Sequence, residues 1–521
     1  MIQPGQLLFC RRCHFFADCV KIIHEKLYSG FLITRPQIDG WPVTKLIPKP
    51  SNLTILALAS LVGYLIFWIW FPLRPYFNTL PLQDVNSLAP SLLAGLGYGL
   101  LLLVLFGLYW LAFRAVQMSK SAPSLAFLLG TAVLLALPLL QTYPINANDL
   151  YRYVIRGRVS SVYQQSPYAA PPNAFSDDPF LPLAGEWAGE TSPYGPLWEL
   201  LAAGITNITG DNLLAGLLTF KTVGLLAHLA CGWLIWQMLA QTSPAKQGSF
   251  TLLWLWNPAL LLMFVVDGHN DVLLMLWQLV ALWFWRRERP LPTGLFLLLG
   301  ALTKPIGLLP LPFFALAAWR NLDNNTARLR VFGWGALLGG TAVLLSFLPF
   351  GSPADLLNRL IRESAGAPGF SPATLLLLIW GEAGQPITTQ LIESVATWAR
   401  LLFGLLGLWL LWLGWRYGRS PLRAAADLLA AYTFQALSFR LWYSTWPFPW
   451  LLLEDETATA IITYRLQAGL WFLLNVQLSV LIYGHLRTYA LGGNHLAAHL
   501  IAIPFVFLLP LLLPLFKRHT T

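Results

Sequence analysis

Residues 91–113 read SLLAGLGYGLLLLVLFGLYWLAF. This stretch holds no charged side chain and is longer than the ~20 residues that a helix needs to cross the hydrocarbon of a bilayer. Similar apolar runs recur along the chain, and several are shorter than a straight span, so we predict about 12 to 14 transmembrane helices. The runs lie at 53–73, 91–113, 123–141, 213–239, 250–266, 271–285, 291–303, 305–319, 331–349, 395–415, 424–439, 443–453, 461–486 and 495–516.

The composition of the whole chain agrees with this pattern. Of 521 residues, 56% are hydrophobic and 11% are charged, and the mean hydropathy is +0.60. A soluble domain carries about a quarter of charged residues, so water-soluble enzymes, disordered tails and disulfide scaffolds are excluded. We therefore predict an all-α, polytopic membrane protein.

The formal net charge of +10 would favour nucleic-acid binding in a soluble protein. Here the basic residues fall mostly in short gaps between apolar runs, where the positive-inside rule accounts for them, and we expect no nucleic-acid partner. Placing these loops in the cytoplasm predicts a multi-pass protein of the plasma (cytoplasmic) membrane with both termini cytoplasmic. The segments left on the outer face are 142–212, 267–270, 350–394 and Arg440.

Residues 1–50 differ from the rest of the chain, with seven Lys/Arg and no long apolar run. The stretch Cys10–His14 matches the spelling of a c-type haem attachment site, and Cys19 and His24 would complete a zinc set. A haem would need an exported segment, whereas this one is predicted to be cytoplasmic, so we interpret the cluster as chance. An over-extended start is the alternative, since the next Met after Met1 is Met118.

The outer segment 142–212 carries seven of the 23 acidic residues. A loop of this length inside a compact membrane protein is usually functional. Asn146 or Asn148 can cap a short helix that runs to about Val162, followed by a proline-rich stretch and a second helix from about Pro196. The segment is therefore predicted to fold over the helices rather than to serve only as a linker.

On the first of these helices Asp149, Tyr153 and Arg156 fall at i, i+4 and i+7, which is one face. A carboxylate beside aromatic and guanidinium groups suits a hydroxylated substrate and a phosphate. The alternative for Asp149 is structural, because an acid in the first turn is stabilised by the helix dipole by about 0.3–1 kcal/mol. The turn Ser192–Pro196 is open to the same alternative, since any tight turn before a helix could use it.

Ionisable residues elsewhere extend the list of candidates. Lys304 lies between two apolar half-spans, where it is either a functional residue or one that snorkels to the interface. Arg440, beside Trp442 and Tyr443, is either an interfacial anchor or a phosphate ligand.

The stretch His269–Asp271 is either a metal or sugar-hydroxyl site or an ordinary turn in which Asn270 caps the next helix. We expect Asp177, Asp178, Arg359 and Arg362 to be solvated.

The order of motifs in the outer segment resembles that of a known class of enzymes. Asp149-Leu-Tyr-Arg-Tyr153 is followed by Gly157, by Ser166-Pro167-Tyr168 and by Ser192-Pro-Tyr-Gly-Pro-Leu197. This order is similar to GT-C class glycosyltransferases that depend on polyprenol-phosphate sugars, above all the alpha-mannosyltransferases of the lipomannan alpha-1,6 type. Later stretches agree with the resemblance, which covers roughly 140–455: Asn257-Pro258, Asp267-Gly-His-Asn-Asp271, Thr303-Lys304-Pro305 and Leu441-Trp-Tyr-Ser-Thr-Trp-Pro447.

The resemblance implies a membrane enzyme that moves a sugar, with mannose expected, from a polyprenyl-phosphate carrier to a glycan or glycolipid hydroxyl on the extracytoplasmic face. The reaction inverts the donor linkage, and the family's general base corresponds to Asp149. Its leaving phosphate needs positive charge or donors, for which the candidates are Lys304, Arg440, Arg156 and His269. The other substrate-binding candidates are Tyr153, Tyr168, Tyr194, Asn270, Asp271, Trp442 and Tyr443.

No cofactor is expected beyond the lipid-linked donor as co-substrate. We predict no metal site, although some GT-C enzymes use a divalent ion, and complete loss of activity in EDTA would contradict this. The predicted domains are a cytoplasmic segment 1–50, a GT-C-like transmembrane catalytic domain 51–455 with the outer loop 142–212, and C-terminal transmembrane helices 456–521.

A transporter or flippase of lipid-linked glycans is the competing hypothesis. It accounts equally well for the spans, the broken helices and the interfacial basic residues. It does not account for the concentration of acidic and aromatic motifs in one outer loop, and we find no convincing internal repeat of the kind that transporters often carry.

Overall fold

The computed structural model describes residues 53–119, 122–363, 368–454 and 463–516. Within these ranges the chain is helical, and its only extended pairing is an isolated bridge between Pro72 and Thr142. This confirms the predicted all-α class. The Cys10–His24 cluster lies outside the described residues.

The helices begin and end close to most of the predicted apolar runs. Their bounds are α2 Leu53–Trp70, α3 Leu73–Tyr76, α4 Val85–Leu88, α5 Leu92–Met118, α6 Leu125–Leu140, α7 Asp149–Ser161, α8 Pro196–Thr209, α9 Leu213–Thr242, α10 Pro244–Leu255, α11 Pro258–Leu261, α12 Asp271–Trp285, α13 Pro290–Thr303, α14 Leu311–Asn321, α15 Asn325–Phe347, α16 Pro353–Glu363, α17 Pro372–Glu382, α18 Thr389–Tyr417, α19 Pro421–Gln435, α20 Phe448–Leu453, α21 Tyr464–Val480, α22 Arg487–Tyr489, α23 His495–Ile503 and α24 Leu509–Phe516.

Seven helical stretches of the described chain are long and apolar enough to cross a membrane. The bent pair formed by α10 and the segment 258–266, with 42° between its halves, would make an eighth. Shorter apolar helices, among them α6, α12, α13 and α17, accompany these spans. The chain is therefore a polytopic membrane protein, while the total of about 12 to 14 spans stays a prediction.

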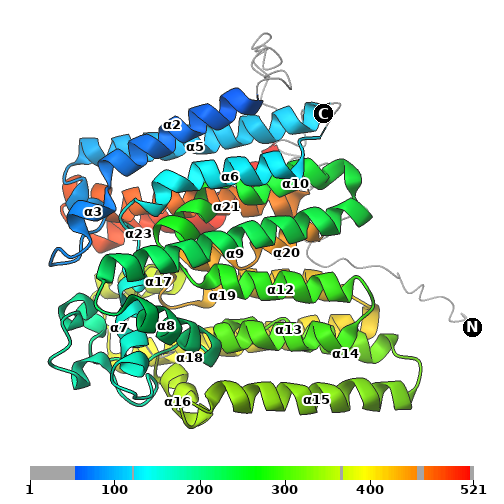
Figure 1. The fold of residues 1–521 in the computed structure, drawn as a ribbon. Helices are drawn as coiled ribbons and strands as arrows, with labels where there is room; N and C mark the ends of the chain where they lie inside the picture. Colours follow the sequence, from blue (N-terminus) through cyan, green and yellow to red (C-terminus); the bar gives the residue numbers. More distant parts are fainter. Residues whose placement is uncertain (1–52, 120–121, 364–367, 455–462, 517–521) are drawn as a thin grey trace, which may run out of the picture. The chain divides into compact units, whose positions relative to one another are not determined.

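The most buried part of the molecule is the stretch 248–272, in which every residue is buried. It comprises α10, α11 and the turn into α12, and it packs against α9 and α6. Figure 1 shows α9, α12, α13 and α15 side by side, in the order in which they contact one another. By contrast, α15 and α18 bury only 11% of their apolar windows, so their large apolar side chains are left to contact lipid.

Two predicted breaks in apolar runs are confirmed. α13 ends at Thr303, and Lys304 is extended, with φ −147° and ψ 122°, because Pro305 cannot continue the helix and disfavours helical geometry in the residue before it. The second break, at Trp446-Pro447, separates the short turn Leu441–Thr445 from α20. Broken helices are tolerated at membrane depth where they face protein or a cavity.

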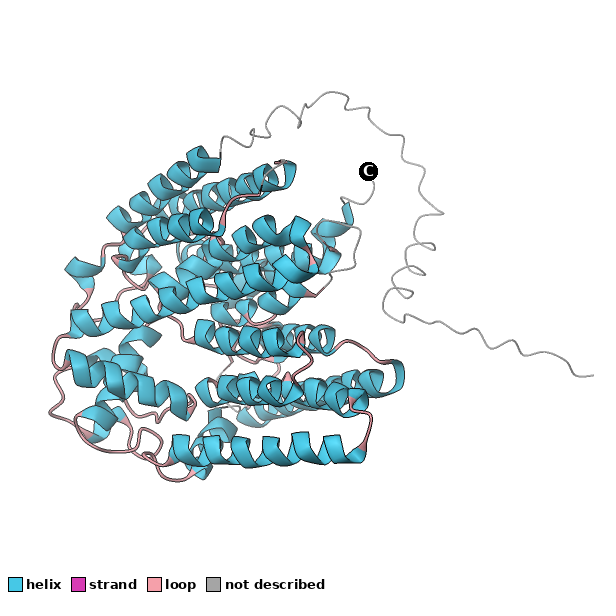
Figure 2. Cartoon of the chain, turned by 45° about the vertical axis from the view of Figure 1, so that its right-hand side comes forward, coloured by secondary structure: helices cyan, strands magenta, loops and turns pink. Residues whose placement is uncertain are grey.

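The short helices of the outer segments gather at one end of the long helices. Figure 1 shows α7, α8 and α16 together there, and Figure 2 shows short helices at that end from a second side. An ion pair of 3.0 Å between Arg359 of α16 and Glu190 joins the stretch 350–394 to the segment 142–212. The segments that the charge pattern placed on one face therefore meet in space.

Candidate active site

Asp149 is the first residue of α7, and its carboxylate is buried at 2% exposure. It forms an ion pair of 2.6 Å with Arg152 Nη1 and lies 3.6 Å from His269 Nδ1. Burial alone would raise the pKa of Asp149, but the surrounding positive charges, led by Arg152, hold it below its ordinary value. The side chain is thus an ionised carboxylate at neutral pH. The side chain of the N-cap residue Asn148 makes no cap hydrogen bond, and Asn146 binds Asp267 instead, so the predicted asparagine cap is wrong.

The loop before α7 is held by a lysine inside α9. Lys221 is completely buried, and its Nζ donates to the carbonyls of Leu139 (3.2 Å), Leu140 (3.1 Å) and Thr142. A charged donor at the last carbonyls of α6 satisfies groups that a helix end leaves open. Lys221 thereby fixes the point from which the chain turns toward Asp149.

Asp267 fixes the other side of the same loop. Its two oxygens accept hydrogen bonds of 3.2 Å from the backbone N–H and the side-chain amide of Asn146. Burial raises the pKa of Asp267 to about 7, although the Asn146 hydrogen bonds act in the opposite direction. Neighbouring positive charge therefore lowers the pKa of Asp149, whereas burial raises the pKa of Asp267, although both residues adjoin the loop before α7.

The turn Asp267–Asp271 brings His269 toward Asp149. Gly268 has φ +66°, and a Cβ there would lie 2.6 Å from Leu150 Cδ1, so only glycine fits. The His269 ring lies against the Trp442 ring with centroids 4.0 Å apart. Burial lowers the pKa of His269 to about 4, so the imidazole is neutral at physiological pH.

Lys304 reaches into the same region from the break after α13. Its Nζ lies 2.8 and 2.9 Å from the two Asp271 carboxylate oxygens and 3.3 Å from Asn270 Oδ1. Trp446 Nε1 donates to the same carboxylate. The snorkelling alternative for Lys304 is therefore wrong, because a buried partner holds the ammonium. Asn270 stands at the N-cap position of α12, as the turn alternative expected, but its side chain makes no cap hydrogen bond and its oxygen accepts from Lys304 instead.

The Ser192–Pro196 turn docks on the chain just before Lys304. Ser192 Oγ donates to Glu199 Oε1 (2.5 Å) and accepts from Tyr194 N–H (3.1 Å). The N–H of Gly195 then donates to Thr303 O at 3.0 Å. A Cβ on Gly195 would lie 2.1 Å from Leu302 O, so the close approach requires glycine. This turn, called the 192–196 brace, therefore holds the chain in place just before Lys304.

The remaining aromatic candidates support this brace. Tyr153 packs against Tyr194, Trp198 and Phe220 with ring centroids 4.6 to 5.7 Å apart, and its hydroxyl accepts from Asn270 N–H at 3.5 Å. The Tyr194 ring also lies 5.7 Å from Lys304 Nζ, within cation–π range.

Three further sequence candidates, Tyr168, Arg440 and Tyr443, border this group. Tyr168 packs on Phe347 and Phe350, although its hydroxyl donates to Tyr194 O at 3.0 Å. Arg440 is exposed, and it contributes to the lowered pKa of Asp149. Tyr443 stacks on Trp446 with centroids 4.3 Å apart.

Two predictions of solvated charge are wrong. Asp178 is buried and pairs with Arg158 at 2.8 Å, because the proline-rich stretch folds back onto α7. Arg359 is buried against Glu190, and its Nε also donates to Thr191 O at 3.2 Å. Asp177 is exposed as expected, and the side chain of Arg362 lies outside the described set.

Several buried polar atoms around Asp149 and Lys304 have no hydrogen-bond partner. They are Arg152 Nε, Arg156 Nη1, Glu199 Oε2, His269 Nδ1 and Asn270 Nδ2. An unpaired buried polar group is costly and calls for a partner. Their concentration at one place supports a polar ligand with several hydroxyl or phosphate oxygens.

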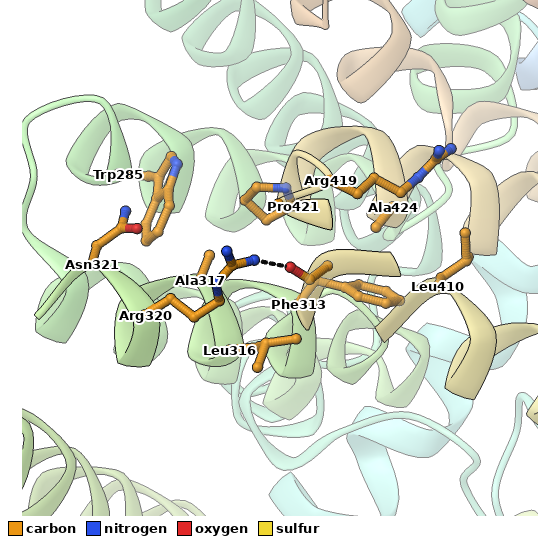
Figure 3. A pocket seen from close by; sticks show the side chains of 12 residues that line it. Trp285, Phe313, Leu316, Ala317, Arg320, Asn321, Leu410, Arg419, Pro421 and Ala424 are labelled. Atoms are coloured by element: carbon orange, nitrogen blue, oxygen red, sulfur yellow. Dashed lines mark hydrogen bonds between the residues drawn. The ribbon is translucent and has the colours of Figure 1, made fainter. Parts of the chain in front are cut away.

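Two cavities lie away from these atoms: one of about 780 Å³ beside Phe180 and Asp211, and one of about 200 Å³ at the far end of the helices (Figure 3).

No group of three or more metal-ligating side chains gathers anywhere in the described ranges. Asp149 instead forms an ion pair with Arg152, and Asp271 forms one with Lys304. The metal independence of the protein stays a prediction for the EDTA experiment.

Sequence reasoning missed four residues of this arrangement: Arg152, Lys221, Glu199 and Trp446. Lys221 was detectable, because a charge within the apolar run 213–239 marks a special position. Glu199 follows Ser192 by seven residues across a proline turn, and no local sequence pattern predicts the hydrogen bond between the two side chains. Trp446 was part of a quoted motif, but its bond to Asp271 spans the chain.

Known proteins match this chain in sequence. Residues 42–320, more than half of the chain, match the family described as "Alpha-(1->6)-mannopyranosyltransferase, N-terminal domain". No solved structure matches significantly.

Curated relatives carry the same description. Alpha-(1->6)-mannopyranosyltransferase B of Corynebacterium glutamicum is 30% identical over 193 residues, covering 36% of this chain and 32% of the relative. Alpha-(1->6)-mannopyranosyltransferase A of the same species is 23% identical over 335 residues, 60% of this chain and 67% of the relative. A probable alpha-(1->6)-mannopyranosyltransferase of Mycolicibacterium smegmatis is 24% identical over 387 residues, 66% and 68%. The aligned part thus spans about a third of the first relative and about two thirds of the others. By the family match, this chain belongs to the alpha-(1->6)-mannopyranosyltransferase family.

Proposed function

We propose that this chain is an integral-membrane mannosyltransferase that moves mannose from a polyprenyl-phosphate carrier to a glycan or glycolipid hydroxyl. The observation that carries the proposal is the set of buried, unpaired polar atoms around an ionised Asp149 and the Lys304–Asp271 pair. Membership of the family supports the sugar, and the resemblance of the outer-segment motifs supports the lipid carrier. The site faces the extracytoplasmic side of the plasma membrane in this proposal, as the basic loops at the other end favour.

Asp149 acts as the general base. The acceptor hydroxyl gives its proton to the carboxylate as its oxygen attacks the anomeric carbon from the face opposite the phosphate. The bond between that carbon and the phosphate oxygen breaks, and the electron pair leaves with the polyprenyl phosphate, so the linkage is inverted. Such a base typically contributes about 10²–10⁴ in rate.

The leaving phosphate is received by the cations nearby. Lys304, Arg156 and Arg440 supply positive charge, and the neutral His269 ring supplies a donor in place of a charge. The substrate phosphate would compete with Asp271 for the Lys304 ammonium, so binding would loosen an ion pair of 2.8 Å. Trp442 and Tyr443 offer aromatic faces for the sugar ring.

The test is transfer from radiolabelled polyprenyl-phosphate-mannose in detergent, with wild type and Asp149→Asn compared. Wild type should form product, and Asp149→Asn should bind donor but transfer it about 10²–10⁴-fold more slowly. Asp178→Asn is the matched control, because it neutralises a buried carboxylate of the same outer segment that is paired with Arg158. Wild-type turnover by Asp149→Asn would refute the base, and donor flipping without transfer would favour the transporter.

A further inference from the structure

A second site lies at the far end of the helices from Asp149. It is a cavity of about 200 Å³ between the ends of α14 and α18 and the start of α19, as Figure 3 shows. Trp285, the last residue of α12, lines it, whereas Asp271, the first residue of α12, binds Lys304. With a rise of 1.5 Å per residue, the helix separates the two sites by roughly 20 Å.

The lining of this cavity is amphipathic. Phe313, Leu316 and Leu410 form apolar walls, while Arg320 and Arg419 contribute cationic side chains. No carboxylate is among the residues that line it. The combination suits a ligand with an apolar body and an anionic group.

The guanidinium of Arg320 has more N–H donors than its one hydrogen bond to Gly414 uses. Its Nη1 donates to Gly414 O, near the end of α18, which is the dashed bond in Figure 3. A guanidinium carries five N–H donors in a planar fork, and this exposed side chain forms no ion pair with a carboxylate of the described chain. A planar fork of this kind matches phosphate oxygens in a bidentate manner.

The surroundings of the cavity are also positive. Arg419 pairs with Asp427, and the same network contains Arg423, Arg465 and Glu454. Among the described residues of this network, three arginines against two carboxylates leave one positive charge in excess, and Arg320 adds another. The buried Nε of Arg419 has no partner. The local field therefore attracts an anion.

The helix beside the cavity faces lipid. Leu402, Leu405, Trp409 and Trp412 fall at i, i+3, i+7 and i+10 on α18, and all four are exposed. The cavity residues Leu410 and Gly414 lie on the other side of α18 from this stripe, and Arg320 is exposed at the mouth of the cavity. We propose that this cavity binds the headgroup of an anionic phospholipid.

The proposal does not depend on the transfer reaction. A zwitterionic phospholipid brings its own positive group and is a poorer match for the surplus of arginine charge. Polyprenyl phosphate shares the phosphate chemistry, but its proposed site is at Lys304, so it serves as a competitor in the test rather than as the occupant.

The experiment uses the full-length protein in nanodiscs or detergent, with retained lipid counted by native mass spectrometry during titration with phosphatidylglycerol or phosphatidylcholine. Wild type should retain one phosphatidylglycerol in preference to phosphatidylcholine. Arg320→Gln should weaken this preference about tenfold. Ala317→Leu, which fills the cavity without a change of charge, should weaken it as well.

Arg416→Gln is the matched control. Arg416 is an exposed arginine at the same end of α18, lies over Tyr417 at 5.6 Å and is not part of the lining. This variant should bind phosphatidylglycerol like wild type. The thermal unfolding of each variant without added lipid should match wild type, which separates binding from folding.

Three outcomes would overturn the proposal. Equal retention of phosphatidylglycerol and phosphatidylcholine would remove the role of charge. Equal losses in Arg320→Gln and Arg416→Gln would show a diffuse field and no site. Displacement of phosphatidylglycerol by equimolar polyprenyl phosphate, with the displacement abolished by Arg320→Gln, would assign the cavity to the carrier lipid instead.

Discussion

The two ends of this helical protein use charge in opposite ways. At the far end, Asp427 accepts from Arg419 and Arg465, and Glu454 accepts from Arg423 and Arg465, so each carboxylate has two partners. These side chains are partly exposed. At the candidate active site the side chains of Asp149, His269 and Asp271 are almost completely buried. Buried atoms without a partner occur at both ends, for example Asn270 Nδ2 and Arg419 Nε.

The difference indicates which end is structural. A partly exposed network with paired carboxylates adds modest stability, whereas ionisable groups that are almost completely buried lower stability and persist where chemistry needs them. The following variants test whether the two ends differ in this way.

The largest effect is expected from breaking the buried pair of Lys304 and Asp271. Lys304→Met leaves Asp271 buried and unpaired, which should destabilise the fold by about 3–5 kcal/mol and abolish transfer. The double variant Lys304→Met/Asp271→Asn removes both charges and keeps an oxygen for Trp446, so it should regain much of the stability but no activity. Thermal unfolding and the radiolabel assay measure the two effects.

Arg465→Met is the counterpart at the far end. Asp427 keeps Arg419 and Glu454 keeps Arg423, so the loss of stability should be smaller and the folded protein should retain its turnover. If Arg465→Met and Lys304→Met were equally destabilising and equally inactive, the distinction between the ends would fail.

The next effect concerns the brace formed by Ser192 and Glu199. Ser192→Ala or Glu199→Ala should release the turn that docks on Thr303 and raise the KM for the lipid donor about tenfold, the equivalent of about 1.4 kcal/mol. Glu199→Gln keeps an acceptor for Ser192 Oγ and should behave almost like wild type. A fall in kcat with unchanged KM would contradict a positioning role.

The pH dependence of stability should reveal Asp267. Its pKa is raised by burial to about 7 in the folded protein from 3.8, so the folded state holds a proton that the unfolded chain releases. This contribution is present at low pH and is lost as the pH rises from ~4 through ~7. Asp267→Asn should remove that part of the decline in Tm between pH 5 and 8. An unchanged slope would mean that Asp267 is ionised in the folded state.

The smallest effect is expected at Arg423, whose side chain is 45% exposed while it pairs with Glu454. Arg423→Gln should cost less than about 1 kcal/mol and leave transfer unchanged, as measured by urea unfolding and the radiolabel assay. A larger loss would mean that the far-end network is a cooperative unit rather than a set of surface pairs.

Much of the local structure was predictable from the sequence. The apolar runs marked most of the helices, and Pro305 and Pro447 marked the breaks. The helices α7 and α8 begin where the sequence predicts, at Asp149 and at Pro196, although the predicted asparagine cap of α7 does not form. These features depend on neighbours a few residues apart, for which hydrophobicity and proline geometry are sufficient causes.

The pairing of the charged groups was not predictable in this way. The sequence expected Asp178 and Arg359 in solvent, and it left Lys304 open between a functional group and an interfacial anchor. Each outcome depended on a partner that a different helix or loop delivers: Arg158 for Asp178, Glu190 for Arg359 and Asp271 for Lys304.

The sequence by itself determined that this is a helical membrane protein, where its helices break, and that the segment 142–212 resembles the family in its motifs. Only the tertiary structure decided that Asp149 lies beside His269, and that Lys221 anchors the loop before α7. The physical reason is range: hydrophobicity, proline geometry and pairs such as Asp149–Arg152 act within a few residues of the chain, whereas the contacts of His269 and Lys221 exist only when packing brings distant segments together.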